Sequence, residues 1–149
     1  MKMNKDVDSA LHVLKGAVQD VLGATLTTSV FADDLKGRLT VEMEYRPADD
    51  DMERVEESAN DKIGENVPIE MFDMDREEAE MEYGDSIYDK FPVPDGIKLL
   101  TLTMIRDWNI NCCRGPHHRR TGSVPRISIS RWRHRPSRRE LEISFELSR

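Results

Sequence analysis

The sequence of 149 residues predicts an α+β fold, a single domain over residues 1–149 in which a mainly antiparallel sheet packs with about three helices. The length is that of one domain with one hydrophobic core. Segments that alternate apolar and polar residues outnumber the segments with a helical period. The strand segments follow one another in hairpin-like runs and do not alternate regularly with helices, which argues against a doubly wound parallel sheet.

The first expected element is a helix near the N-terminus. Apolar residues recur at spacings of three and four between Val7 and Leu22, which is typical of an amphipathic helix. Gly23 follows directly, and glycine is the residue that most readily ends a helix. We therefore expect this helix to end at Gly23.

Two strands are expected after this helix. The first is the Thr/Ser/Val-rich run from Leu26 to Phe31, and the second runs from Arg38 to Tyr45 with apolar and polar residues in alternation. Such alternation indicates a half-buried strand. The turn residues between Asp33 and Gly37 predict that the two strands pair antiparallel.

An acidic second helix is expected from Asp49 to Glu65. Its apolar residues Met52, Val55, Ala59 and Ile63 fall on one side, and its charged residues fall on the other. This is the pattern of a surface helix with a solvated face, so we expect its role to be structural.

The middle of the chain predicts a strand, a short helix and a central strand. The strand runs from Val67 to Met74. Asp75, with Glu78 three residues later, forms a capping-box-like start for a helix that ends at Gly84. From Ile97 to Trp108 apolar residues occupy both faces, as in a central strand.

The last two expected strands form a hairpin. Residues 126–134 alternate isoleucine with polar residues, and residues 141–147 repeat this pattern. The connection at Pro136–Arg138 is rich in turn-forming and charged residues, so we expect the two strands to pair across it.

The charge is distributed very unevenly along the chain. Residues 1–107 carry 12 basic and 26 acidic side chains, and residues 108–149 carry 10 basic and 3 acidic ones. Between Trp108 and Arg139 there is no acid, and this block contains Arg114, Arg119, Arg120, Arg126, Arg131, Arg133, Arg135, Arg138 and Arg139. A basic block of this kind predicts contact with a phosphate backbone. The alternative is that these arginines pair with acidic residues of the same fold.

The sequence also predicts the compartment. No apolar run approaches the ~18 residues needed to span a bilayer, and the first ten residues are charged, so we expect neither a membrane helix nor a signal peptide. Cys112 and Cys113 are adjacent, and they are the only cysteines. Adjacent cysteines do not build a disulfide framework, so we expect a cytoplasmic protein whose thiols are free for metal.

Two pairs of side chains indicate a metal site. Asp8 and His12 are four residues apart on the first helix, so they share one face beside the apolar stripe. Cys113 and His117 form a second pair in a segment after the central strand. Together they offer O, N, S and N donors, a set that zinc accepts in tetrahedral geometry. Each pair alone is also compatible with a hydrogen-bonded core histidine or with chance spacing.

Four stretches carry a resemblance to a known family. "DSALHVLKGAVQDVLG", "ENVPIEMFDMDREEAE", "YDKFPVPDGIKLL" and "RDWNINCCRGPHHRRTGS" occur in this order. Together they resemble the small, freestanding alanyl-tRNA editing proteins of the AlaX family, which are similar to the editing domain of alanyl-tRNA synthetase. The likeness extends from about Val7 to Leu147 and implies an editing-domain-like fold.

The resemblance implies one zinc ion. The family pattern is H-x-x-x-H on a helix followed much later by C-x-x-x-H; His12 matches the second histidine, and Cys113 and His117 match the second motif. Asp8 stands where the family has its first histidine, so a carboxylate replaces one nitrogen donor. Either Asp8 completes a four-ligand site, directly or through water, or three ligands hold the ion more weakly.

The resemblance also implies a reaction. It is hydrolysis of the ester that links a wrong amino acid to the 3' end of alanine tRNA, in trans, with serine as the expected amino acid and glycine as the alternative. The metal could activate a bound water or hold the substrate. A site that spares alanine should hydrogen-bond the serine hydroxyl. Thr27, Thr28 and Ser29 are the candidates, although each is also an ordinary strand residue.

The expected partner is tRNA(Ala), bound at its 3' CCA end, and no DNA or membrane partner is expected. Arg114, Arg119 and Arg120 flank the metal ligands and could clamp phosphates of this single-stranded end. Arg131 and Arg133 extend the basic surface.

Four further side chains are candidates for lesser roles. Trp108 or Trp132 could stack on a base or ribose, but a tryptophan at strand spacing is more often a core residue, and Trp108 fits that description. His118 and His134 could act as acid–base groups or contact phosphate.

Two other functions remain open from the sequence. In one, Asp8 has weakened the metal site, and the chain is a catalytically impaired RNA-binding homologue. In the other, the metal is structural and the partner is a protein. Turnover of an aminoacyl ester would distinguish the editing hydrolase from both of these alternatives. Salt-dependent RNA binding would distinguish the RNA-binding homologue from the protein-binding domain.

Overall fold

The computed structural model describes residues 4–149. Its elements are α1 (Lys5–Leu22), β1 (Thr27–Asp33), β2 (Lys36–Glu42), α2 (Asp49–Glu65), β3 (Glu70–Asp75), α3 (Arg76–Tyr83), η1 (Gly84–Ile87), β4 (Leu99–Ile105), β5 (Asn109–Cys112), η2 (Thr121–Ser123), β6 (Arg126–Arg135) and β7 (Glu140–Ser148). The predicted α+β class with three α-helices is confirmed. None of the helices in residues 4–149 has the length and apolar character needed to cross a membrane.

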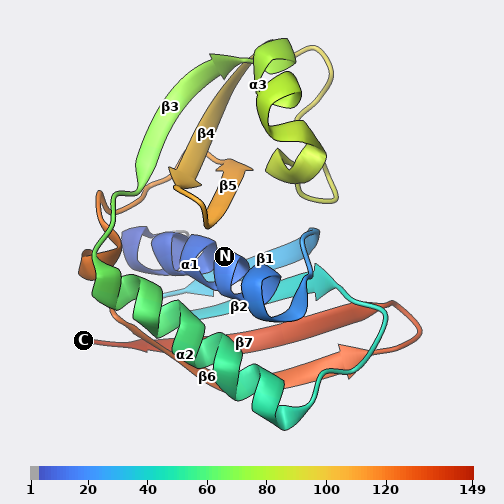
Figure 1. The fold of residues 1–149 in the computed structure, drawn as a ribbon, viewed down its shortest axis with the longest axis vertical. Coiled ribbons are helices and arrows are strands. Elements are labelled where there is room, and N and C mark those ends of the chain that lie inside the picture. The colour runs from blue at the N-terminus through green and yellow to red at the C-terminus, as the bar shows by residue number, and fades with distance from the viewer. Residues whose placement is uncertain (1–3) are drawn as a thin grey trace.

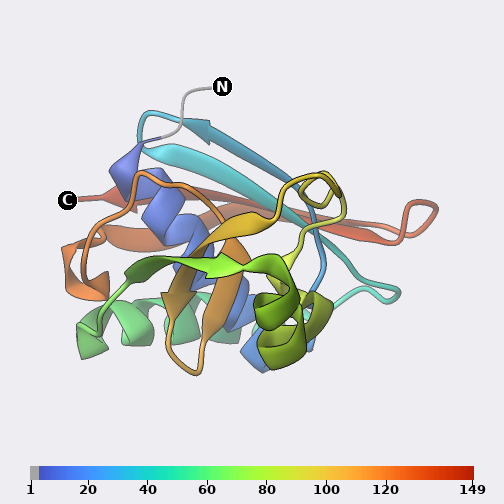
Figure 2. The same cartoon turned by 90° about the horizontal axis from the view of Figure 1, so that it is seen from above.

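The strands form two antiparallel sheets with α1 between them (Figure 1). The larger sheet has the order β1-β2-β7-β6, and the smaller sheet has the order β3-β4-β5. Helices α1 and α2 cover one face of the larger sheet, and the smaller sheet lies over α1 with α3 beside it (Figures 1 and 2). Helix α1 is therefore enclosed from both sides.

This enclosure explains why α1 has almost no exposed face. Asn4 caps its start by accepting a hydrogen bond from the Val7 N–H, and Gly23 ends it with a left-handed φ of 73°. Apolar residues of α1 enter the main core with β2, β7 and α2. Polar residues of α1 are buried as well, among them Asp8, Ser9 and His12. Burying such groups is costly unless they are paired, so their partners indicate what this face of the helix does.

The smaller sheet has its own apolar layer on the face away from α1. Leu100 and Leu102 of β4 pack there with Ala79 of α3 and Ile87 of η1. The opposite face of the smaller sheet meets α1, and Ile105 at the end of β4 belongs to the main core. The smaller sheet therefore covers α1 on the side opposite the larger sheet.

Several predicted elements are confirmed at their predicted ends. Helix α1 ends at Gly23, α2 spans the predicted residues, and the Asp75 carboxylate accepts from the Glu78 N–H at the start of α3. The pairings β1–β2 and β6–β7 are antiparallel as predicted.

Other boundaries differ. The strands divide into two antiparallel sheets, and Asn109–Cys112 forms a strand, β5, in a stretch that was expected to be a loop after the strand ending at Trp108. Strand β2 ends at Glu42, short of the predicted Tyr45, and β3 begins at Glu70. The residues just before β3 make only an isolated bridge, between Pro68 and Arg120.

Gly16 fixes the distance between α1 and the β4–β5 turn. A Cβ atom there would overlap the indole ring of Trp108, whose Nε1 donates to the Val13 carbonyl at 3.0 Å. We expect Gly16→Ala to lower the free energy of unfolding by about 1–3 kcal/mol because the ring must move. Gly64→Ala, also within a helix but in open space, is expected to leave stability unchanged or raise it. Denaturant unfolding of both variants measures this, and equal effects would contradict the close packing.

Candidate metal centre

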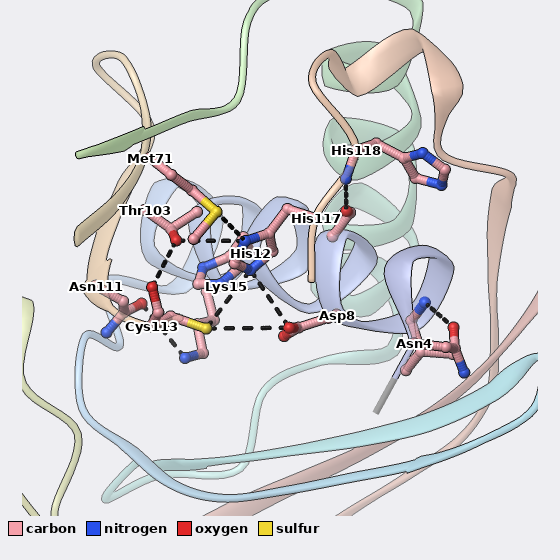
Figure 3. Close-up of polar contacts among 12 residues, drawn as sticks. Asn4, Asp8, His12, Lys15, Met71, Thr103, Asn111, Cys113, His117 and His118 are labelled. Atoms are coloured by element: carbon pink, nitrogen blue, oxygen red, sulfur yellow. Dashed lines mark hydrogen bonds and ion pairs between the residues drawn. The ribbon is translucent and has the colours of Figure 1, made fainter. Parts of the chain in front are cut away.

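Four side chains from two separate parts of the chain meet at one point. Asp8 and His12 project from the same face of α1, one turn apart, and Cys113 and His117 come from the segment that follows β5 (Figure 3). The ligand atoms of all four lie within 4.8 Å of one another. These are the four residues that the sequence predicted as metal ligands, and the fold brings them together.

The distances suit a small tetrahedral ion. The Cys113 Sγ atom is 3.5 Å from His117 Nε2 and 4.0 Å from Asp8 Oδ2, and His117 Nε2 is 3.4 Å from Asp8 Oδ2. Zinc bond lengths of about 2.0–2.3 Å in a tetrahedron place neighbouring donors roughly 3.3–3.8 Å apart. Two of the three distances among Asp8, Cys113 and His117 fall in this range, and all four ligand atoms lie within 4.8 Å of one another, so a zinc ion would draw the four side chains somewhat closer together.

In both histidines, contacts to the Nδ1 atom orient the imidazole ring. His12 Nδ1 is 3.0 Å from the Asn109 Oδ1 atom. His117 Nδ1 is 3.4 Å from the Thr103 hydroxyl and 3.3 Å from the Met71 sulfur. In each case a proton on Nδ1 leaves the Nε2 lone pair free, and such outer contacts commonly fix metal-ligating histidines.

Burial determines the protonation states in the cluster. It raises the pKa of Asp8 to about 6 and also raises the pKa of the Cys113 thiol. Burial lowers the pKa of His117 to about 4 and that of His12 well below its usual value. Near neutral pH the metal-free cluster therefore has an ionised Asp8, two neutral imidazoles and a protonated thiol. The contact between Asp8 and His117 is then not an ion pair, and both imidazoles are in the form that binds metal.

A pocket of about 510 Å³ lies beside the cluster. Its lining includes Lys15 of α1, Thr27 of β1, and Asn109 and Asn111 of β5. Asn109 also contacts His12, so the pocket and the cluster share a wall. The four candidate ligands do not line the pocket themselves, and Asn109 connects the pocket to His12.

The three predicted discriminator residues have different positions. Thr27 is buried and lines the pocket. The Thr28 hydroxyl donates to the Thr40 carbonyl at 3.3 Å, and Ser29 is exposed. Of the three, only Thr27 lines the pocket.

The predicted tRNA-binding arginines fall into two groups. Arg114 and Arg119 are exposed in the segment that carries Cys113 and His117, and Arg120 bonds to Asn66 at the end of α2. Arg131 and Arg133 lie on β6, the strand of the larger sheet farthest from β1. Arg133 is 3.6 Å from Glu142, so pairing within the fold accounts for this arginine in part.

The remaining candidate side chains have partners within the fold. The Trp108 ring packs on Gly16 as expected of a core residue, and Arg46 covers the Trp132 ring at 4.6 Å from its centroid. His118 Nε2 contacts Asp6 at 2.7 Å, and His134 Nε2 contacts the Met43 carbonyl at 2.8 Å. Neither histidine belongs to the metal cluster.

Removing the Asn109 contact is expected to weaken metal binding. Asn109→Leu leaves His12 Nδ1 without its acceptor, and loss of such a partner typically costs about 10–100-fold in metal affinity. Asn109→Asp keeps an acceptor and is expected to keep the affinity. Competition of each variant with a zinc-sensitive dye measures the change. An Asn109→Leu variant with wild-type affinity would show that the ring is held by packing alone.

Comparison with known proteins identifies relatives of the chain. No family model matches it. It is 32% identical over 124 residues to an alanine–tRNA ligase of Nitrosopumilus maritimus, covering 83% of the chain and 14% of the ligase. It is 32% identical over 119 residues to the ligase of Saccharolobus islandicus, and 30% identical over 122 residues to that of Methanopyrus kandleri; each match covers 13% of the ligase. The chain is therefore similar to one segment of the alanine–tRNA ligases, a segment that makes up about one seventh of each enzyme.

Proposed function

We propose that the chain is a trans-editing hydrolase that cleaves the ester between a wrong amino acid and the 3' end of tRNA(Ala), with serine as the amino acid and glycine as the alternative. The main support is the convergence of Asp8, His12, Cys113 and His117 beside a pocket. Similarity to a segment of alanine–tRNA ligases connects this site with alanine tRNA.

The chemistry of amino-acid selection explains why such a hydrolase is needed. A pocket that accepts alanine cannot reject by binding alone every competitor that differs by one small group. A second site that hydrolyses the wrong ester removes the error. The editing site must then recognise what alanine lacks, which in serine is a hydroxyl group.

Zinc is the metal that this donor set favours, since one sulfur, two imidazole nitrogens and one carboxylate oxygen are all common zinc ligands. When bound, it would supply positive charge that polarises the ester or holds the amino or ribose group of the substrate. Asp8 and a Cys113 thiolate together would balance that charge. Asn109 and Thr103 would keep the two imidazoles in place.

Thr27 is the residue we propose to recognise serine. It is buried and lines the pocket beside the cluster. Thr27→Val keeps the shape but removes the hydroxyl, so we expect cleavage of the seryl ester to fall about tenfold, the cost of one hydrogen bond, with alanyl ester still spared. Thr28→Val is the control, because the Thr28 hydroxyl bonds to the Thr40 carbonyl. Equal effects of the two variants would contradict this role for Thr27.

Arginines are proposed to bind the RNA. Arg114 and Arg119 are exposed near the metal ligands and would contact phosphates of the 3' CCA end, with Arg120 beside them. Arg131 and Arg133 lie on the distant strand β6 and would contact another part of the tRNA. Binding through phosphates predicts affinity that falls steeply as salt rises.

The experiment that tests the proposal is deacylation of tRNA(Ala) charged with serine, glycine or alanine. The protein is assayed as purified, after chelation, and after zinc is added back. We expect the protein to cleave the seryl or glycyl ester and to spare the alanyl ester. Chelation is expected to abolish turnover, and added zinc is expected to restore it. A metal-loaded protein that binds tRNA but cleaves no ester would instead be the catalytically impaired RNA-binding homologue.

A further inference from the structure

Lys15 is a partly buried lysine between the candidate metal site and the pocket. It follows His12 by three residues on α1, so both side chains project from the same face of the helix. Its side chain is only 10% exposed, and it lines the pocket together with Thr27 and Asn109. Figure 3 shows its ammonium group next to Cys113 and Asn111.

Two acceptors hold the ammonium group in place. Lys15 Nζ is 3.3 Å from Asn111 Oδ1 and 3.5 Å from Asp89 Oδ1. Asn111 is itself fixed, because its Nδ2 donates to Asp89 at 3.1 Å and to the Ile87 carbonyl at 3.4 Å. The position of the charge is therefore set by β5 and by the segment after η1.

These two contacts leave donor capacity unused. An ammonium group has three N–H donors, and in the part of the chain that the structure describes only these two acceptors face it. Both contacts are at the long end of the hydrogen-bond range. A partly buried charge with a spare donor beside a pocket is suited to a ligand oxygen that carries or develops negative charge.

The charge of Lys15 also acts on the cluster. It opposes the burial effect on the pKa of Asp8, and it adds to the burial effect on the pKa of His117 and of His12. Lys15 is one turn from His12 on α1, and Figure 3 shows its ammonium group beside Cys113, so the charge borders the candidate metal site.

We propose that Lys15 is a catalytic residue whose ammonium group donates a hydrogen bond to the carbonyl oxygen of the ester being hydrolysed, an inference that rests on the proposed function. The oxygen of a water molecule bonds to the carbonyl carbon, and the π electrons move to the carbonyl oxygen that faces Lys15. The bond from carbon to the ribose oxygen then breaks, and a proton from the attacking water ends on that ribose oxygen. Lys15 stays protonated and stabilises the transient negative charge.

Turnover of Lys15 variants is the first test. Loss of one such donor typically costs about 10²–10³-fold in kcat, so we expect a decrease of that size for Lys15→Gln, with KM changed by only a few fold. Lys15→Arg is expected to recover part of the rate. Lys5→Gln, an exposed lysine on the same helix, is the control.

Metal content separates catalysis from support of the metal centre. The absorption spectrum and stoichiometry of the cobalt-substituted protein are expected to be the same in wild type and Lys15→Gln. If zinc or cobalt binding falls together with kcat, Lys15 acts on the metal centre and the proposal is wrong. A kcat within threefold of wild type would also overturn it.

Ligand binding gives a readout that does not depend on turnover. The probes are 3'-deoxy-3'-(serylamino)adenosine, which mimics the ester, and a phosphonate analogue that mimics the anionic tetrahedral intermediate. Calorimetry is expected to show Lys15→Gln binding the phosphonate about 100-fold more weakly, with little change for the amide. An equal change for both probes contradicts a role in charge stabilisation. If the wild-type protein neither binds the probes nor cleaves any ester, the proposed function fails and this inference fails with it. If the wild-type protein is active and the Lys15→Gln variant is equally active, only the inference is refuted.

Discussion

Cys113→Ala is expected to lower the affinity for zinc by about 10²–10³-fold and to stop ester hydrolysis. Sites with four ligands bind zinc with about 10–16 kcal/mol, so one ligand contributes roughly 2.5–4 kcal/mol on average. Cys113 supplies the only sulfur in the cluster, and its Sγ lies within 3.5–4.0 Å of the His117 and Asp8 ligand atoms. Equilibrium competition with a chelator of known affinity measures the loss.

Cys112→Ala is the matched control for this prediction. Cys112 is the neighbouring residue, but its side chain packs with the apolar layer on the other face of the smaller sheet. Burial raises the pKa of the Cys112 thiol to about 11, and the thiol does not belong to the group of four candidate ligands. We expect Cys112→Ala to bind zinc as wild type does. Equal losses in the two variants would mean that folding, and not ligation, is affected.

Asp8→Ala is expected to have an effect of the same size, a loss of zinc affinity of about 10²–10³-fold, by the same reasoning. Asp8→His replaces the carboxylate with a nitrogen donor and is expected to retain tight binding. If Asp8→Ala binds zinc as tightly as wild type, the ion is held by three side chains and Asp8 is not a ligand.

The pH dependence of zinc binding tests Asp8 more specifically. If Asp8 and Cys113 are both ligands, metal binding requires the Cys113 thiolate and the Asp8 carboxylate. Above pH 6 only the thiol must lose a proton, because burial places the pKa of Asp8 at about 6 and that of His117 at about 4. Affinity should therefore rise about tenfold per pH unit above pH 6, and more steeply, by up to about a hundredfold per unit, below it.

Comparing the pH profiles of Asp8→Asn and Asp6→Asn tests whether Asp8 causes the steeper part of the profile. Asp8→Asn cannot release a proton, so the steeper part below pH 6 is expected to disappear. Asp6→Asn should retain it, because the Asp6 carboxylate contacts His118 and Arg149 outside the cluster. A wild-type profile with one slope from pH 5 to 8 would contradict direct ligation by Asp8.

The sequence predicts the helices well because each carries its own local signals. Helix α1 has a regular apolar period and a terminal glycine, and α3 begins at a capping aspartate. Strand β5 was missed because Asn109–Cys112 is short and half polar, with asparagines that face α1. The division into two sheets depends on pairings between residues far apart in the chain, which periodicity does not encode.

The four candidate ligands could be named from the sequence because the spacing within each pair is local and matches the pattern of the AlaX family. Asp8 and His12 are one helical turn apart, and Cys113 and His117 share a short segment. The supporting residues could not be predicted in this way. Asn109 and Lys15 belong to no sequence motif. Their proposed roles depend on the crossing of β5 over α1, which brings Asn109 to His12 and Asn111 to Lys15. For the same reason the sequence did not separate Thr27, which lines the pocket, from Thr28 and Ser29.

The central claim is that Asp8, His12, Cys113 and His117 together hold one zinc ion. X-ray absorption at the zinc edge of the protein loaded with one equivalent of zinc tests this most directly. We predict one sulfur at about 2.3 Å and three nitrogen or oxygen neighbours at about 2.0–2.2 Å, with the sulfur lost in Cys113→Ala. A first shell of oxygen and nitrogen alone in the wild-type protein would contradict the claim, because it would place the zinc outside the cluster.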